Sequence, residues 1–344
     1  MAGVSEATVS RVMNGVGPMK ESTRRKVLQA AEQLNYQPNA VASSFASGKS
    51  RNIGVVLPHV PKVHLFSTYY FSEILSGIGE AVRTREYGLL LLYRDPGRAY
   101  DYVALFRAMR ADACLILGAS SLPQEEEAIA RLAAERLPFC LVDHRSDNPL
   151  VSSVTADHAE GNYRAAKHLL DSGHRRIGFL NGSPQYSNSR DRLAGYRRAL
   201  EEAGVPYDPG RIYEGNYSRT SGYAAADAIY RDLDRLDAVL CGNDRMAIGL
   251  IQGLRDKGCP VPQRLPVVGY DNSDAARLTD PPLTTVEVPF YEMGRLAAEK
   301  LLAVLTNRPD AEAVFREVLP TRLIVRQSCG SQPSFGGRSD DKKK

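Results

Sequence analysis

Apolar and polar residues follow two different periods along residues 52–330, one typical of strands and one typical of helices. Short apolar runs bounded by turn residues predict strands, and the longer amphipathic stretches between them predict helices. The first half has predicted strands at 53–57, 88–93, 113–117 and 139–142, separated by helices at 71–86, 98–110 and 123–136. The second half has predicted strands at 177–181, 211–214, 238–241 and 265–269, with helices at 158–172, 190–204, 219–232 and 244–257.

This alternation predicts the fold class. Strands joined by crossover helices favour parallel pairing, so we expect an α/β fold with two doubly wound parallel-sheet subdomains. The chain is expected to return to the first subdomain at 286–290, add a helix at 291–306 and cross back at 321–325. The predicted N-subdomain is therefore 52–155 plus 286–314, and the predicted C-subdomain is 156–285 plus 315–330. The tail, 331–344, contains glycine and charge and is expected to be disordered.

A separate pattern opens the chain. Ser5 can cap a following helix by accepting a backbone N–H, and Val9, Val12 and Met13 then form one apolar stripe. A short helix with a buried stripe and an exposed face of Ser, Thr and Arg can enter a DNA major groove, which predicts the second half of a helix-turn-helix. The residues predicted to face DNA are Ser5, Glu6, Ala7, Thr8, Ser10, Arg11 and Asn14.

The net charge is concentrated at this end of the chain. Residues 1–51 carry seven basic and three acidic side chains, which accounts for the whole net charge of +4. The remaining residues are electrically balanced. A basic segment that coincides with a helix-turn-helix pattern is what electrostatic attraction to DNA phosphates requires. The alternative interpretation is a basic face that is only solvated.

Several short motifs along the chain carry a family resemblance. They are AGVSEATVSRVMNG near the start, NYQPNA at 35–40, NIGVVLP at 52–58, SGHRRI at 172–177, RLAGY at 192–196, GND at 242–244, VGYD at 268–271, PPLTT at 281–285 and LPTRLIVR at 319–326. In this order the chain resembles the LacI/GalR (lactose-repressor) family of bacterial transcription regulators. The resemblance implies a helix-turn-helix headpiece, here 1–38, a hinge at 39–51, and a periplasmic-binding-protein-like core at 52–330.

The resemblance also implies how the headpiece and hinge act. In the family, the hinge becomes a helix when two copies meet on the operator, and a leucine wedges into the minor groove. Phe45 stands at that position here, and phenylalanine can also unstack a base step. Alternatively, Phe45 packs against the next domain. The first helix of the helix-turn-helix has no counterpart before Gly3, so we expect the headpiece to be partly unfolded as written, through a late start codon or a cut chain.

Polar residues follow several of the predicted strands. Asp143, Asn243 and Asp271 come directly after strands, and Arg190 and Arg192 follow the loop after 177–181. Because ligands of open α/β sheets bind at the carboxyl ends of the strands, these residues predict a site for a small polyhydroxylated ligand in the cleft between the subdomains.

The resemblance assigns effector contacts to part of this set and adds aromatic residues. The implied positions are Tyr70, Phe71, Asp143, Arg192, Asn243, Asp271 and Phe290, with Arg190, His144 and Asn188 as weaker candidates. Two alternatives stay open. Asp143 and Asp271 could cap helices, and the aromatic residues could belong to the core.

The sequence indicates no catalytic or metal chemistry. It has no nucleophile elbow, phosphate loop or zinc motif, and its histidines lack metal-ligand spacing. We therefore expect no enzyme activity, no cofactor and no metal. The five cysteines lack paired spacing, and no signal segment or run of eighteen apolar residues occurs, so a cytoplasmic protein with reduced thiols and no membrane association is expected.

The function predicted at this point is an effector-responsive transcription regulator, a repressor that binds a pseudo-palindromic operator as a homodimer. Its effector is expected to be a small polar molecule, a sugar or sugar derivative, bound in the cleft. The alternative is a sugar-binding module without DNA-binding activity. The sequence leaves the effector, the operator and the direction of the response open.

Overall fold

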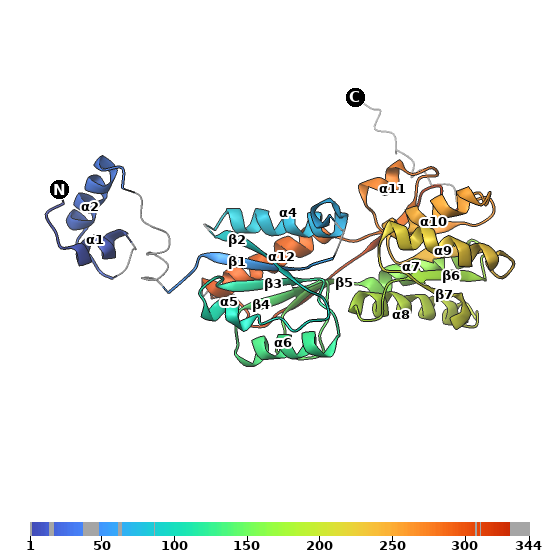
Figure 1. Ribbon diagram of the computed structural model, residues 1–344, viewed down its shortest axis with the longest axis horizontal. Coiled ribbons are helices and arrows are strands. Elements are labelled where there is room, and N and C mark those ends of the chain that lie inside the picture. The colour runs from blue at the N-terminus through green and yellow to red at the C-terminus, as the bar shows by residue number, and fades with distance from the viewer. Residues whose placement is uncertain are drawn as a thin grey trace, which may run out of the picture.

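The computed structural model describes residues 2–13, 17–36, 48–60, 64–85, 87–306, 308–309 and 311–330 (Figure 1). Asn14, Phe45, most of the predicted hinge and the predicted tail at 331–344 lie outside the described residues. None of the described helices is both long enough and apolar enough to cross a membrane.

Two helices form the described part of the headpiece. α1 (Glu6–Met13) and α2 (Glu21–Gln33) pack against each other, and Val12 and Val27 are their buried side chains. Ser5 caps α1 as predicted, because its Oγ accepts the Thr8 backbone N–H at 3.3 Å. Lys20 precedes α2 without a side-chain cap, since an ammonium group can only donate.

The core contains two sheets with the same spatial strand order. The first consists of β11 (Arg316–Leu319), β5 (Ser153–Ala156), β4 (Phe139–Val142), β3 (Ala113–Leu117), β1 (Asn52–Pro58) and β2 (Gly88–Arg94). The second consists of β12 (Arg322–Ile324), β10 (Thr284–Glu287), β9 (Val267–Asp271), β8 (Ala238–Cys241), β6 (Ile177–Asn181) and β7 (Ile212–Glu214). Among these strands, only β12 pairs antiparallel with its neighbour.

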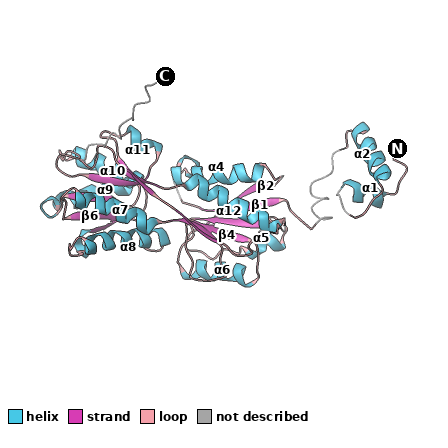
Figure 2. Ribbon diagram, turned by 180° about the vertical axis from the view of Figure 1, so that it is seen from behind, coloured by secondary structure: helices cyan, strands magenta, loops and turns pink. Residues whose placement is uncertain are grey.

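Helices cover both faces of each sheet (Figures 1 and 2). In the N-subdomain, α4 (Tyr69–Arg83) and α12 (Phe290–Leu305) cover one face, and α5 (Val103–Arg107) and α6 (Pro123–Ala134) cover the other. In the C-subdomain, α7 (His158–Asp171) and α8 (Ser187–Glu202) cover one face, and α9 (Arg219–Arg231) and α10 (Asp244–Asp256) cover the other. Shorter elements are α11 (Asp274–Leu278) and the 3-10 turns η1 (Leu65–Ser67), η2 (Pro209–Arg211) and η3 (Leu233–Arg235). The predicted doubly wound α/β architecture is confirmed.

Glycines allow the paired helices to approach closely. A Cβ added at Gly77 of α4 would lie 1.9 Å from the carbonyl oxygen of Tyr291 in α12. A Cβ at Gly195 of α8 would lie 2.0 Å from the carbonyl oxygen of Ala159 in α7. Because no side chain fits at either crossing, the tight packing of α4 on α12 and of α7 on α8 depends on these glycines.

The structure corrects two predicted boundaries between the subdomains. Residues 286–287 belong to β10, which pairs with β9 and β12 in the second sheet, so the chain crosses to the N-subdomain only after Glu287. Residues 316–319 form β11, which pairs with β5 in the first sheet rather than belonging to the C-subdomain. A strand this short fits either sheet, and only the pairing partner decides which sheet it joins.

Smaller differences concern single elements. The helix predicted at 98–110 is only α5, five residues long, and β5, β11 and α11 were not predicted as separate elements. The crossings between the subdomains therefore lie near residue 157, at 288–289 and at 320–321. These three segments position the two halves of the cleft.

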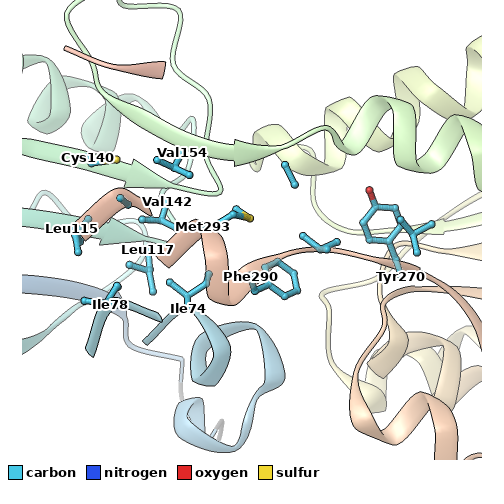
Figure 3. Close-up of a cluster of buried hydrophobic side chains, with 14 of the residues drawn as sticks. Ile74, Ile78, Leu115, Leu117, Cys140, Val142, Val154, Tyr270, Phe290 and Met293 are labelled. Atoms are coloured by element: carbon cyan, nitrogen blue, oxygen red, sulfur yellow. The ribbon is translucent and has the colours of Figure 1, made fainter. Parts of the chain in front are cut away.

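One hydrophobic cluster runs through both subdomains. Figure 3 shows Ile74, Leu117 and Met293 on the N-subdomain side, with Phe290 between them and Tyr270 of the C-subdomain. Phe290 begins α12, directly after a crossing segment. The core is thus continuous at the point where the subdomains are joined.

Candidate functional site

The predicted DNA-facing residues lie on the outside of α1. Ser5, Glu6, Ala7, Ser10 and Arg11 are exposed, while Thr8 is half-buried because Val12 turns the opposite face inward. Thr8 Oγ1 also lies 3.0 Å from Ser5 Oγ, which orients the start of the helix. α1 therefore presents a short polar face that carries one acidic side chain, Glu6, and one basic side chain, Arg11.

The C-subdomain wall of the cleft carries the predicted charged residues. Asp271 ends β9 with φ at +117° and is 7% exposed, and Asn243 follows β8. Asn243 caps α10, because its Oδ1 accepts the Met246 N–H at 2.9 Å, and its Nδ2 donates to the Tyr217 carbonyl at 3.1 Å. The alternative role as a helix cap, which the sequence suggested for Asp143 and Asp271, is thus filled by Asn243. Asp271 caps nothing, since Ser273 precedes α11.

Asp271 and Arg192 retain unused polar atoms. Among the described residues, the Asp271 carboxyl makes no hydrogen bond or ion pair, and burial together with the nearby Asp244 carboxyl raises its pKa. Arg192 is buried, its Nη1 donates to the Tyr217 hydroxyl at 3.3 Å, and its guanidinium lies 4.4 Å from the centre of the Tyr270 ring. Its Nε has no partner in the described structure. An acceptor and a donor are therefore available on the same wall.

Asp143 lies on the N-subdomain wall and reaches across the cleft. Its Oδ1 lies 2.6 Å from His158 Nε2, and its Oδ2 accepts Asn188 Nδ2 at 2.8 Å. Burial opposes ionisation, but the charge and hydrogen bond of His158, the charge of Arg192 and the hydrogen bond from Asn188 outweigh it, so the pKa of Asp143 lies below its usual range. Asp143 is ionised and spans the two subdomains.

The contacts of the second ring nitrogen of His158 indicate which nitrogen donates to Asp143. Nδ1 lies 3.2 Å from the Tyr270 hydroxyl and 3.4 Å from Arg192 Nη2. A guanidinium can only donate, so Nδ1 acts as the acceptor and Nε2 carries the proton. His158 therefore directs its Nε2–H at Asp143.

The predicted aromatic residues form a second part of the N-subdomain wall. The Tyr70 ring packs edge-to-face on Phe290 at 5.1 Å and on Phe71 at 4.8 Å between centroids. Phe290 is buried in the shared core, whereas Tyr70 and Phe71 are half-buried. Burial and the Asp143 carboxylate raise the pKa of Tyr70, so its hydroxyl stays protonated. The core alternative fits Phe290 best.

Arg190 is not brought together with the other predicted residues. Its side chain is exposed at the mouth of the cleft, where Nη2 donates to Ser121 Oγ at 3.0 Å and Nη1 donates to the Pro184 carbonyl at 2.9 Å. The Ser121 N–H also donates to the Gln185 carbonyl at 2.8 Å. These bonds join the two subdomains, so the cleft is shut at this side.

Sequence reasoning missed His158 and Tyr217 as cleft residues. Both lie shortly after a strand: His158 follows β5, which ends at Ala156, and Tyr217 follows β7, which ends at Glu214. The rule that identified Asp143 could have found Tyr217, because a strand was predicted at 211–214, but it could not have found His158, because β5 was not predicted.

A cavity of about 550 Å³ lies outside this cluster. It is bordered by Tyr69, Glu73, Phe290, Tyr291 and the crossing segments, and it contains none of Asp143, Arg192, Asn243 or Asp271. In the described part of the chain, no three His, Cys, Asp or Glu side chains are grouped as metal ligands.

Comparison with known proteins places this geometry in a family. Residues 1–39 match the model of the bacterial regulatory proteins of the lacI family, and residues 166–329 match a periplasmic binding protein-like domain. Catabolite control protein A of Priestia megaterium is 33% identical over 330 residues, covering 95% of this chain and 96% of that protein. The transcriptional repressor PurR of Photobacterium profundum is 34% identical over 331 residues, with the same coverage. The chain belongs to the LacI family.

Solved structures of LacI-family proteins share the whole architecture. A lac repressor dimer bound to operator and the anti-inducer ONPF superimposes with a TM-score of 0.78 at 28% identity, covering 95% of this chain and 96% of that one. The transcriptional regulator CelR in complex with cellobiose has a TM-score of 0.71 at 30% identity, covering 95% and 97%. The predicted family and the periplasmic-binding-protein-like fold are confirmed.

Proposed function

We propose that this LacI-family chain is an effector-responsive transcription repressor that binds a pseudo-palindromic operator as a homodimer in the cytoplasm. The observation that carries the proposal is the pair of unused polar atoms between the subdomains, the Asp271 carboxyl and Arg192 Nε, on the same chain as a basic N-terminal segment with an exposed polar helix. The relative PurR is named as a transcriptional repressor, and the structural relatives include complexes with operator and with cellobiose.

The cleft chemistry favours a neutral polyhydroxylated effector, a sugar or sugar derivative. Asp271 would accept from ligand hydroxyls, and Arg192 Nε would donate to them. Asn243 and Tyr217 add amide and phenol groups beside them. Tyr70 and Phe71 offer ring faces and edges opposite, which suits the apolar C–H faces of a sugar.

Two copies of the chain are needed to read a two-fold operator. The outer strand β2 exposes Leu89, Leu91 and Tyr93, by 39%, 39% and 47%. They pair in register with Ile53, Val55 and Leu57, which are fully buried, so the stripe extends a core face to the surface. We propose that a second copy covers this stripe, because an edge strand with three large apolar side chains is otherwise prone to uncontrolled association.

The proposed coupling runs from the cleft to the headpiece. Closing the cleft around the effector would favour one relative orientation of the subdomains, and that orientation sets whether the hinge helix and the predicted wedge residue Phe45 engage DNA. Arg11 and its neighbours on α1 would read base edges. By linkage, effector and operator then change each other's affinity by the same factor.

The test starts from a random duplex library. Duplexes retained by the chain at low ionic strength are sequenced, and binding of the enriched sequence is measured by fluorescence anisotropy over a salt series, with and without D-glucose, D-ribose or cellobiose. We expect a palindromic sequence, an affinity that falls steeply with salt and a change on adding one sugar. The Arg11→Ala variant should lose the specific binding.

Failure to enrich any duplex would contradict the proposal. A shift of melting temperature with a sugar, combined with no enriched duplex, would instead support the alternative of a sugar-binding module without DNA-binding activity. The melting measurement therefore separates the two functions.

A further inference from the structure

Four arginines stand where the chain enters four neighbouring strands of the N-subdomain. Arg51 directly precedes β1. Three residues before β2, β3 and β4 stand Arg85, Arg110 and Arg136, in that order. Because these strands are parallel and adjacent in the order β4-β3-β1-β2, the four residues share one edge of the sheet. With neighbouring strands about 4.8 Å apart, this arginine row is about 14 Å long.

The sheet itself fixes the spacing of the row. The Gly88 N–H, at the start of β2, donates to the Arg51 carbonyl at 2.8 Å. The Asp112 N–H, just before β3, donates to the Asn52 carbonyl at 2.9 Å. The entries to β1, β2 and β3 are therefore joined by backbone hydrogen bonds, and β4 continues the pairing from β3.

The arginine row offers unused hydrogen-bond donors. All four of its residues are exposed. Among the described residues, the guanidinium groups of Arg85, Arg110 and Arg136 make no salt bridge and no hydrogen bond. A guanidinium is always charged, and its planar fork of N–H groups matches the oxygens of a phosphate. The row therefore has the chemistry of a phosphate-binding surface.

Two acidic side chains at the same edge are already engaged. The Asp112 carboxylate accepts the Ser50 N–H at 2.7 Å and the Arg51 N–H at 2.9 Å. The Glu135 carboxylate accepts from Arg107 at 3.1 Å. Glu86 lies outside the described residues. The core is electrically balanced as a whole, but the described part of this edge carries an excess of positive charge.

The row lies at the edge of the sheet to which the headpiece is attached. Figure 1 shows β1 to β4 beginning at the end of the core that lies away from the C-subdomain. Asp143 follows the opposite, carboxyl end of β4, so the effector cleft is at the other edge. Residues 37–47 connect the headpiece to Gly48. At about 3.6 Å per residue they span at most about 40 Å, which keeps a duplex bound by α1 close to the row.

Helix dipoles account for only part of this pattern. Arg85 and Arg136 follow the ends of α4 and α6, where positive charge is favoured. However, Arg136 has a φ of +51° and Arg51 a φ of +54°. In this left-handed region a glycine is less strained than any residue with a side chain. Arginine at these two positions is therefore not the choice that favours folding most.

We propose that the arginine row is a second DNA contact, which binds phosphates of the duplex beside the segment read by α1. The length of the row corresponds to about four base-pair steps of 3.4 Å. Phosphate contacts carry no sequence information directly, so the row strengthens binding without changing which sequence is preferred. The proposal rests on the proposed function, because the headpiece must bring the duplex to this edge.

The salt dependence of binding tests the row. Anisotropy measures binding of the full chain to a long mixed-sequence duplex from about 50 to 200 mM salt. The variant Arg85→Gln/Arg110→Gln/Arg136→Gln removes three contacts from each protomer. Each phosphate contact contributes about 0.9 to the slope of log K against log salt, so the slope should become shallower by about 2.7 per protomer. The dissociation constant at the lowest salt should rise by about 10-fold or more.

A matched variant excludes a general effect of net charge. Arg131→Gln/Arg197→Gln/Arg231→Gln removes the same charge from exposed positions outside the row, and its slope should stay close to that of the parent. Arg136→Gly separates binding from folding. It should melt no lower than the parent, because glycine suits this backbone, and still lose about 0.9 of slope per protomer. A helix-dipole role would instead lower the melting temperature and leave the slope unchanged.

The outcomes separate this contact from the proposed function. A slope equal to the parent's in the row variant overturns the row, even when an operator has been enriched. A shallower slope in the row variant, combined with no enriched operator, supports the row and contradicts the sequence-specific repressor. If the parent binds no duplex at low salt, both proposals are overturned.

Discussion

The two walls of the cleft are built differently. The N-subdomain wall consists of Tyr70, Phe71 and Phe290, which continue the hydrophobic core, and of Asp143, whose bonds are all satisfied. The C-subdomain wall consists of Arg192 and Asp271, both buried with unused polar atoms.

This difference indicates a division of labour. An apolar wall stabilises the fold and shapes the site but discriminates poorly between ligands. A buried polar group without a partner destabilises the fold, and a ligand that hydrogen-bonds to it binds more tightly. We expect substitutions in the N-subdomain wall to change folding, and substitutions in the C-subdomain wall to change binding.

The largest expected effect is on the apolar wall. Phe290→Ala should lower the free energy of unfolding by about 3–5 kcal/mol, because it leaves a cavity in the cluster shared by both subdomains. Urea unfolding at constant protein concentration measures this loss. A loss of unfolding free energy no larger than that of an ordinary surface substitution would show that the aromatic wall is not part of the core.

His144 should make the same wall sensitive to acid. Burial and the neighbouring Arg190 lower its pKa from 6.5 to about 4. As the pH falls below 6.5, His144 binds a proton in the unfolded chain but stays neutral in the folded chain. The free energy of unfolding that is present above pH 6.5 is therefore lost. Between pH 8 and pH 5 the protein should lose about 2 kcal/mol more than His144→Phe. Equal pH dependence of the two proteins would contradict this assignment.

A substitution in the polar C-subdomain wall should increase the free energy of unfolding instead of lowering it. Asp271→Asn removes a buried carboxylate without a partner, so at pH 8 it should raise the free energy of unfolding by roughly 1–2 kcal/mol while weakening sugar binding. Because the pKa of Asp271 is raised, the gain should disappear at pH 4, where the parent carboxyl is also neutral. A variant that is less stable at both pH values would show that the carboxylate is satisfied.

The smallest effect on the free energy of unfolding should come from the hydroxyl of Tyr70. The Tyr70 hydroxyl interacts with the backbone of Gly118. Tyr70→Phe removes only the hydroxyl group and should cost about 1 kcal/mol or less. Tyr70→Ala, which also removes the ring, serves as the comparison in the same unfolding assay. Equal losses would mean that the ring contributes nothing.

Much of the site could be predicted because strand ends leave a local signal. Asp143, Asn243 and Asp271 were found from their positions directly after apolar runs, and the structure places all three, buried, just beyond or at the carboxyl ends of β4, β8 and β9. Arg190 and Arg192 share one loop and helix start, so the sequence could not distinguish them. In the structure the two-residue spacing turns Arg192 inward and Arg190 to the surface.

The sequence by itself determined the alternation of strands and helices, the basic front end, the cap at Ser5 and the family, because these depend on local periods and local composition. Only the tertiary structure decided that residues 286–287 pair in the second sheet and residues 316–319 in the first. It also decided that the Asp143 carboxylate is hydrogen-bonded, whereas the Asp271 carboxyl has no partner among the described residues. The reason is physical. Strand pairing and the contact of Asp143 with His158 join segments that come together only when both subdomains have folded. A local sequence pattern therefore does not show which segment will be the partner.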